Sequence, residues 1–150
     1  MKIEKAVEKD HLILTEITKK SKAFWGYSEE QLKKWKNSLT ISAEYICKNE
    51  TYKLSQNNVI IGYYSYLEKE NKTIYLDNLF IIPEKIGLGL GKFLMKDVFE
   101  KIKNKGFQKI VLHSEPNAEN FYTKMGFEKI GEFETAIKNR FMPIMEINLY

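Results

Sequence analysis

Hydrophobic and polar positions follow two different periods along this chain, which predicts a mixed order of strands and helices. Strands are predicted over residues 2–7, 51–56, 59–67, 73–82, 109–112, 128–133 and 144–149. Helices are predicted over residues 10–20, from 28 through 35, from the glycine-rich turn near residue 90 to about 104, and over 116–124. The order indicates an α/β fold in which antiparallel strands precede a strand–helix–strand unit with parallel fourth and fifth strands.

Short polar segments mark where these elements begin and end. Asn57-Asn58 tolerates positive φ and predicts a hairpin turn between the second and third strands. Ser28 to Gln31 has the pattern of a capping box, which predicts a helix beginning after Ser28. Gly106 follows the long third helix and predicts its end. We find no repeat, linker or low-complexity segment, so residues 1–150 are expected to form a single domain.

Composition supports a globular chain and narrows its partners. The 150 residues are 43% hydrophobic and 29% charged, and no apolar run approaches the ~20 residues of a membrane helix. The net charge is +4, and the lysines are scattered among glutamates, which argues against nucleic-acid binding. Cys47 is the single cysteine. It is expected to be a half-buried small side chain, and a reducing cytoplasmic compartment is expected for the protein.

The most distinctive segment runs from Leu79 to Lys92, where an apolar stretch passes through a proline and alternating glycines into a helix. Glycines let backbone N–H groups approach an anion, and a helix N-terminus adds positive partial charge. A P-loop is excluded because Ile86 stands at its first glycine and Phe93 at its Ser or Thr. A dinucleotide fingerprint is excluded because Lys92 replaces its third glycine. The segment predicts a phosphate-binding loop, with a plain glycine-rich connector as the alternative.

Two segments in a fixed order carry a family resemblance. The first is Leu76–Pro83 (LDNLFIIP), followed by Gly89 and Gly91, and the second is Glu115–Phe127 (EPNAENFYTKMGF). Together they resemble the GCN5-related N-acetyltransferase (GNAT) family. The first is similar to that family's fourth strand and its Gln/Arg-x-x-Gly-x-Gly/Ala acetyl-CoA loop, and the second to its Asn-Ala…Phe-Tyr-x-Lys-x-Gly-Phe segment after strand five. Ile86 departs from the family at the Gln/Arg position.

The resemblance implies a GNAT fold whose parallel fourth and fifth strands splay apart at their C-terminal ends. It also implies an acetyl-CoA-dependent N-acetyltransferase that acts on a primary amine by direct attack in a ternary complex, with no metal. The pantetheine arm of acetyl-CoA is expected to pair with the backbone around Phe80 and Ile82. The expected cofactor-binding residues are Phe80, Ile81, Ile82, Lys85, Gly87, Leu88, Gly89, Leu90, Gly91, Lys92, Asn117 and Phe121. Asn117 could instead cap the helix that follows it.

Transfer to an amine needs a proton donor for the departing thiolate and a proton acceptor for the amine. Tyr122 matches the family's general-acid position, and its hydroxyl has an ordinary pKa of about 10. The alternative for Tyr122 is a packing role on its helix. Asp77 is the first choice for the base and Glu115 the second, while His113 is a further titrating group and a solvated surface role stays open for both carboxylates.

Aromatic residues near the N-terminus and a lone arginine are candidates for the acceptor site. Trp25 and Tyr27, with Tyr45, could form one wall, and Arg140 could bind a substrate carboxylate or phosphate. A surface salt bridge is the alternative for Arg140. The expected partner is a small-molecule or peptide amine, without nucleic acid or membrane, and a homodimer is left open. A non-catalytic CoA-binding sensor module is the second hypothesis, favoured by Ile86, whereas Tyr122 favours the enzyme.

Overall fold

The fold is seen in a computed structural model, which describes residues 1–135, 137 and 139–149. Over these ranges seven strands form one mixed sheet in the order β1-β2-β3-β4-β5-β7-β6. The strands are β1 (Lys2–Lys5), β2 (Glu50–Gln56), β3 (Val59–Lys69), β4 (Thr73–Ile81), β5 (Lys109–His113), β6 (Glu128–Glu134) and β7 (Phe141–Asn148). The helices are α1 (His11–Phe24), α2 (Glu29–Lys34), α3 (Lys36–Leu39), α4 (Ala43–Lys48), α5 (Leu90–Asn104) and α6 (Glu119–Lys124). The predicted α/β order is confirmed.

The chain divides into two compact units, which we describe one at a time. The first unit consists of Met1–Tyr66 and Asn78–Met95, and the second of Leu67–Asp77 and Lys96–Tyr150. Strand β4 and helix α5 therefore contribute residues to both units. The phosphate-binding loop predicted from the sequence belongs to the first unit, and the predicted general acid belongs to the second.

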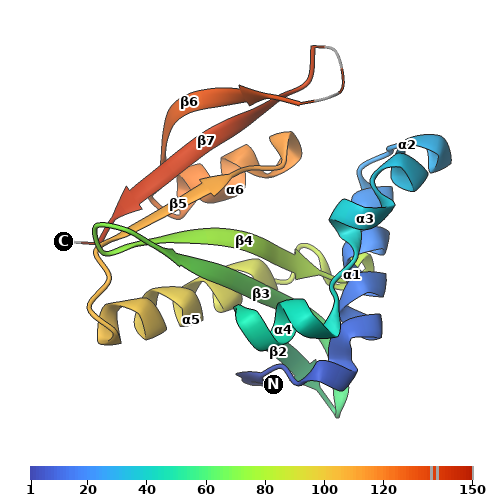
Figure 1. The fold of residues 1–150 in the computed structure, drawn as a ribbon, viewed down its shortest axis with the longest axis horizontal. Coiled ribbons are helices and arrows are strands. Elements are labelled where there is room, and N and C mark those ends of the chain that lie inside the picture. Colours follow the sequence, from blue (N-terminus) through green and yellow to red (C-terminus); the bar gives the residue numbers. More distant parts are fainter. Residues whose placement is uncertain (136, 138, 150) are drawn as a thin grey trace. The chain divides into compact units, whose positions relative to one another are not determined.

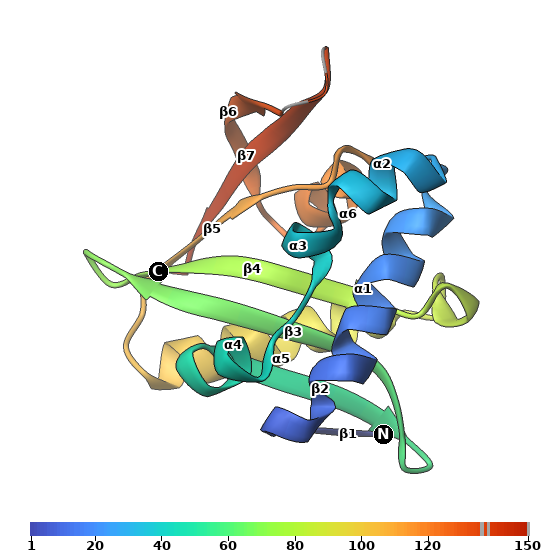
Figure 2. The ribbon, with the colours of Figure 1, turned by 45° about the vertical axis from the view of Figure 1, so that its right-hand side comes forward.

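In the first unit, helices cover one face of an antiparallel ribbon. β1 pairs with β2 and β2 with β3, and the turn at Asn57 and Asn58 has φ values of 52° and 65°, which confirms the predicted hairpin. Figure 2 shows α1 crossing β2 and β3 with α4 on the same side. The apolar core between them contains Ala6, Leu14, Ile17, Ile41, Ile46 and Tyr63. This packing places the C-terminal end of α1 beside the last residues of β4, because Ser21 donates a hydrogen bond to the Ile81 carbonyl.

The helices between α1 and β2 are shorter and more numerous than the sequence predicts. Ser28 caps α2 by accepting the Gln31 N–H at 3.0 Å, as expected, but that helix ends at Lys34. Helices α3 and α4 were not predicted. The prediction for Cys47 is wrong: its side chain is exposed, and its thiol donates to Glu8 Oε1 at 2.6 Å. α4 buries the neighbouring Ile46 in the core instead, which turns Cys47 outward.

The second unit is built around β5. Thr73–Tyr75 of β4 pairs in parallel with Lys109–Val111 of β5, which confirms the predicted parallel pair. β5, β7 and β6 lie side by side as antiparallel strands (Figure 1). β7 begins at Phe141 rather than at the predicted Ile144. The α5 segment of this unit ends at Asn104, just before Gly106, whose φ of 86° matches the predicted helix end.

Candidate active site

The glycine loop of the first unit has the backbone geometry that a phosphate-binding turn requires. Gly87 and Gly89 have φ values of 87° and 81°, a conformation that side-chain-bearing residues rarely adopt. A Cβ added at either position would meet no atom within 4 Å, so open space lies against both. Gly91 lies in the first turn of α5, and this first turn contains no acidic residue. The loop and the positive end of this 15-residue helix therefore fit an anionic group such as the phosphates of a coenzyme.

The side chains of the loop face solvent. Ile86 and Leu88 are exposed, as is Lys92, whereas Lys85 is half-buried and Leu90 is buried in the core. The two lysines are the charged side chains that the loop offers to an anion. Ile86 presents an apolar surface where the family pattern has Gln or Arg. Backbone N–H groups therefore carry most of the anion-binding capacity of this loop.

The backbone at the end of β4 amends one expectation about the cofactor. The Ile82 N–H donates to the Ile61 carbonyl of β3 at 2.9 Å, so the amides of Phe80 and Ile82 are directed toward β3. Successive residues of a strand direct their amides to opposite edges. Leu79 and Ile81 therefore present N–H and carbonyl groups to the other edge of β4. The strand edge that suits an added peptide-like ligand belongs to these two residues rather than to Phe80 and Ile82.

Tyr122 lies in α6 of the second unit, in an aromatic environment. Its ring makes edge-to-face contacts with Phe121 and Phe127, at centroid distances of 5.1 and 5.5 Å. Burial raises the pKa of the Tyr122 hydroxyl above its ordinary value. The hydroxyl, which is protonated at neutral pH even at its ordinary pKa of about 10, holds its proton more tightly in this environment.

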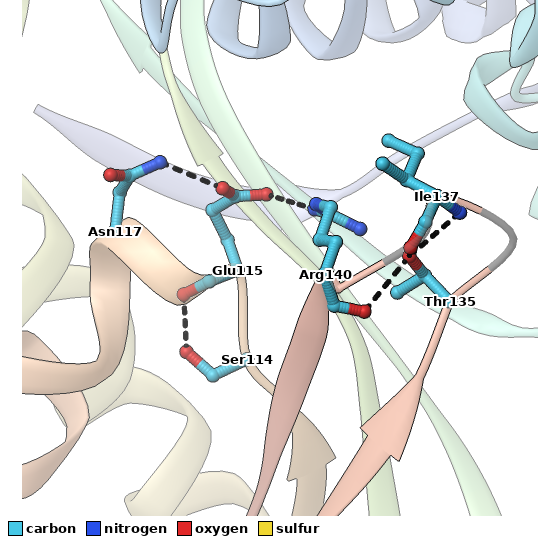
Figure 3. Close-up of polar contacts among 6 residues, drawn as sticks. All are labelled: Ser114, Glu115, Asn117, Thr135, Ile137 and Arg140. Atoms are coloured by element: carbon cyan, nitrogen blue, oxygen red, sulfur yellow. Dashed lines mark hydrogen bonds and ion pairs between the residues drawn. The ribbon is translucent and has the colours of Figure 1, made fainter.

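A charged cluster joins the segment before α6 to the start of β7 (Figure 3). Arg140 Nη2 donates to Glu115 Oε2 at 3.0 Å, and Asn117 Nδ2 donates to Glu115 Oε1 at 2.9 Å. The side chains of Arg140 and Glu115 are only 13% and 11% exposed. Thr135 accepts the Ile137 N–H and donates to the Arg140 carbonyl, which closes the hairpin beneath the arginine. Glu115 thus binds two donors at once, an arrangement better suited to holding them than to taking a proton.

The other predicted residues of the second unit are placed differently. Asp77 is exposed. The pKa of the Tyr75 hydroxyl is raised above its ordinary value, mainly by burial of Tyr75 and secondly by the negative charge of Asp77. The ring of His113 lies against Tyr75 and Phe133, each at a centroid distance of 5.3 Å. This contact indicates a packing role for His113. Asn117 does not cap α6, whose N-cap is Ala118.

The predicted aromatic wall forms two ring pairs in the first unit. Trp25, at the end of α1, is 38% exposed and contacts Phe24 edge-to-face at 5.0 Å. Tyr27 contacts Trp35 edge-to-face at 4.9 Å. The Phe24–Trp25 pair therefore exposes large apolar rings to solvent, whereas Tyr27 and Trp35 are half-buried.

Sequence reasoning missed two polar residues that contact the predicted Tyr45. The Tyr45 hydroxyl and the Ser65 hydroxyl are 2.8 Å apart, and Asn78 Nδ2 donates to both, at 2.9 Å to Ser65 and 3.3 Å to Tyr45. Asn78 lies inside the Leu76–Pro83 segment, so a signal for it was present in the sequence. Its partners come from other elements and carry no local signal.

Within the described ranges, no helix is both long and apolar enough to cross a membrane. Within the same ranges, His, Cys, Asp and Glu side chains form no group of three placed to bind a metal ion.

An α/β sheet with an open glycine turn before a long helix is typical of proteins that bind anionic ligands. Comparison of the chain with known protein families identifies the family to which it belongs. A family model described as "Acetyltransferase (GNAT) domain" matches residues 25–148. This match covers most of the chain and residues of both units. The chain therefore belongs to the GNAT acetyltransferase family.

Similar proteins support this assignment. The chain is 30% identical over 94 residues to thialysine N-epsilon-acetyltransferase of Mus musculus, which covers 58% of this chain and 55% of that protein. It is 34% identical over 92 residues to the [ribosomal protein bS18]-alanine N-acetyltransferase of Haemophilus influenzae, covering 61% of this chain and 60% of that protein. The chain thus spans little more than half the length of these curated relatives.

Solved structures show that the fold is shared. The PaiA N-acetyltransferase of Thermoplasma acidophilum, in complex with coenzyme A, matches with a TM-score of 0.82 at 21% identity over 98% of both chains. A GCN5-related N-acetyltransferase of Rhodopseudomonas palustris matches with a TM-score of 0.80 at 18% identity over 98% of this chain and 94% of that one.

Proposed function

We propose that this protein transfers an acetyl group from acetyl-CoA to a primary amine by direct attack in a ternary complex. The observation that carries the proposal is the pair of left-handed glycines, Gly87 and Gly89, before α5 in a chain of the GNAT family. A loop of this geometry binds phosphate through backbone N–H groups. Acetyl-CoA supplies the acetyl group and carries such phosphates.

The first unit supplies the proposed cofactor contacts. Backbone N–H groups from Gly87 to Lys92 bind the phosphates, and Lys85 and Lys92 add positive charge. Ile81 and Leu79 present the edge of β4 to the pantetheine amides, replacing the contacts first expected at Phe80 and Ile82. The side chain of Ile86 cannot donate a hydrogen bond, so we expect the loop to bind the phosphates more weakly than it would with a Gln or Arg at this position.

The second unit supplies the proposed proton donor. Tyr122 is protonated at neutral pH, and its hydroxyl donates to the departing thiolate. Asn117 and Phe121 are proposed to contact the cofactor beside it. Asp77 is retained as the proposed base because it is exposed and can take the amine proton through ordered water. Glu115 is bound by Arg140 and Asn117, so its proposed role is to position them.

The acceptor is proposed only as a class. The mouse relative is named for thialysine and the Haemophilus relative for an alanine of ribosomal protein bS18. Both names describe amines, one on a small amino acid and one on a polypeptide. Thialysine and a peptide with N-terminal alanine are therefore the first acceptors to test with this chain.

The test is release of free thiol from acetyl-CoA by the purified protein in the presence of each of these two amines. The proposal expects amine-dependent thiol release and one acetylated product by mass spectrometry. Acetyl-CoA binding without amine-dependent release from either amine would contradict it and favour the sensor hypothesis. A chain that does not bind acetyl-CoA would contradict both.

A further inference from the structure

Three neutral polar side chains form a closed hydrogen-bonded ring in the first unit. Asn78 comes from β4, Ser65 from β3 and Tyr45 from α4. The ring distances are 2.8 Å between the two hydroxyls, 2.9 Å from Asn78 to Ser65, and 3.3 Å from Asn78 to Tyr45. Ser65 has no exposed surface, while Asn78 and Tyr45 are half-buried. Burying these groups costs free energy that apolar side chains would not incur, which suggests that the ring has a use beyond packing.

The ring holds the Asn78 carboxamide by its nitrogen end. In the structure Nδ2 lies 2.9 Å from the Ser65 hydroxyl and 3.3 Å from the Tyr45 hydroxyl, and donates to both. The carbonyl oxygen Oδ1 lies at the opposite end of the same planar group and can only accept hydrogen bonds. The ring therefore aims an acceptor away from Ser65 and Tyr45.

The place of Asn78 on β4 connects this acceptor with the proposed chemistry. It immediately precedes Leu79 and Ile81, whose backbone we propose for the pantetheine arm. Asn78 and Phe80 share one face of the strand because side chains alternate. Phe80 packs against Tyr63 and against the core beneath α1. α1 ends at the exposed aromatic residues that we propose for the acceptor.

We propose that Asn78 Oδ1 binds the attacking nitrogen of the acceptor amine and that Tyr45 and Ser65 position it; this inference rests on the proposed function. In the reaction an N–C bond forms and the C–S bond breaks, with the C–S electron pair leaving on sulfur. The departing sulfur takes a proton from the proposed donor, the Tyr122 hydroxyl, and the amine nitrogen passes one through water to the proposed base, Asp77. Asn78 exchanges no proton: it accepts one N–H of the amine and leaves the nitrogen lone pair for attack.

An amide at this position differs from a carboxylate in carrying no charge, and this difference affects the protonation of the bound amine. A carboxylate would bind the ammonium form, raise its pKa and reduce the fraction of amine able to attack. A neutral oxygen orients the nitrogen without that penalty. The inference therefore predicts opposite behaviour for two changes, removal of the oxygen and replacement of the amide by an acid.

The experiment measures kcat, KM and the pH dependence of kcat/KM for whichever of thialysine or the N-terminal-alanine peptide the wild type acetylates faster. Asn78→Ala is expected to lower kcat/KM for the amine at least tenfold, with the acetyl-CoA Kd unchanged. Asn78→Asp is expected to move the acidic limb of the kcat/KM profile upward by about one pH unit. Tyr45→Phe removes one bond of the ring and is expected to lower kcat/KM about threefold.

A charge control separates local from general effects. Asn37→Asp adds the same charge at an exposed position of α3 in the same unit, and its pH profile is expected to match the wild type. Thermal unfolding of each variant reports folding, and Asn78→Asp, which is nearly isosteric, decides the question if Asn78→Ala does not fold.

The outcomes separate this inference from the proposed function. Asn78 variants with wild-type kcat/KM and an unshifted pH profile would overturn the inference and leave the acetyltransferase proposal intact. Loss of acetyl-CoA affinity in both variants would also overturn it, because Asn78 would then belong to the cofactor site. Failure of the wild type to acetylate any amine would overturn the proposed function and this inference with it.

Discussion

The neutral ring of the first unit (Asn78, Ser65 and Tyr45) and the charged cluster of the second unit (Glu115, Arg140 and Asn117) both keep polar side chains away from solvent, but they compensate the cost in different ways. Asn78, Ser65 and Tyr45 satisfy one another with hydrogen bonds and no net charge. Glu115 and Arg140 are almost as buried but neutralise each other as an ion pair, with Asn117 as a second donor to the carboxylate.

The difference shows what each cluster can do. Each member of an ion pair depends on the other, because a lone buried charge is far more costly than a lone amide. The charged cluster is therefore suited to holding a loop and a hairpin together. The neutral ring can direct a hydrogen-bond acceptor without altering the charge of what it binds. We expect the neutral ring of the first unit to orient the acceptor amine, and the second unit to hold the groups that matter to proton transfer and stability.

The largest effect should come from the proton donor of the second unit. Tyr122→Phe removes the hydroxyl and keeps the aromatic contacts with Phe121 and Phe127. We expect kcat to fall by roughly 10²–10⁴ with an unchanged acetyl-CoA Kd, the range for a positioned general acid. Steady-state kinetics at saturating amine and a separate calorimetric titration measure the two quantities. A loss below about threefold would mean that water or another group protonates the thiolate.

The contrast between the clusters is tested by two double-mutant cycles. Arg140→Leu removes the guanidinium that pairs with the nearly buried Glu115 carboxylate, so we expect a loss of about 2–3 kcal/mol in the free energy of unfolding. In the cycle with Glu115→Leu, the coupling should exceed that of a Tyr45→Phe and Ser65→Ala cycle, expected at about 1 kcal/mol. Urea unfolding measures both. Equal coupling energies would show that the ion pair and the neutral ring contribute alike to stability.

The glycine loop gives a prediction specific to the first unit. Gly89→Val puts a branched side chain into a backbone with φ of 81° and into the open space proposed for phosphate. We expect acetyl-CoA to bind at least tenfold more weakly, about 1.4 kcal/mol. Gly106→Val is the matched control, since it has φ of 86° and equally open surroundings but lies at the end of α5. Calorimetry showing the same loss in both would mean that strain, not the loop, weakens binding.

Much of the fold could be predicted because its signals are local. The long helix α5 and the β2–β3 hairpin carry a clear period and their own end signals, so their bounds were nearly right. β7 begins at Phe141, before the predicted start at Ile144, and runs through Pro143, a residue type that central strands disfavour. Pro143 lacks an N–H, yet it pairs with Glu132 and its carbonyl accepts the Ser114 N–H. The short helices α3 and α4 were missed because their stability comes from burying Leu39 and Ile46.

The candidate site also contains parts that the sequence predicts from local signals and parts that it does not. The glycine loop and the segment around Tyr122 are contiguous motifs, and a contiguous motif can be read directly. Asn78, Ser65 and Tyr45 come from three elements, and only packing of α4 on the paired strands brings them together. Arg140 and Glu115 are 25 positions apart and meet through the pairing of β5 with β7. Sequence reasoning named both residues but could not predict that they bind each other.

The smallest expected effect concerns the exposed rings of the first unit. Trp25→Ala removes one ring of the Phe24–Trp25 pair, and an exposed aromatic surface at a helix end is available to an apolar part of the acceptor. We expect the acceptor KM to rise about threefold to tenfold, because burying part of one ring contributes about 1 kcal/mol, while kcat and the acetyl-CoA Kd stay unchanged. Leu12→Ala is the control, since Leu12 is exposed on the same helix but lies near its other end. A fall in melting temperature without a change in KM would place Trp25 in the packing of α1 and limit recognition in the first unit to the glycine loop and Asn78.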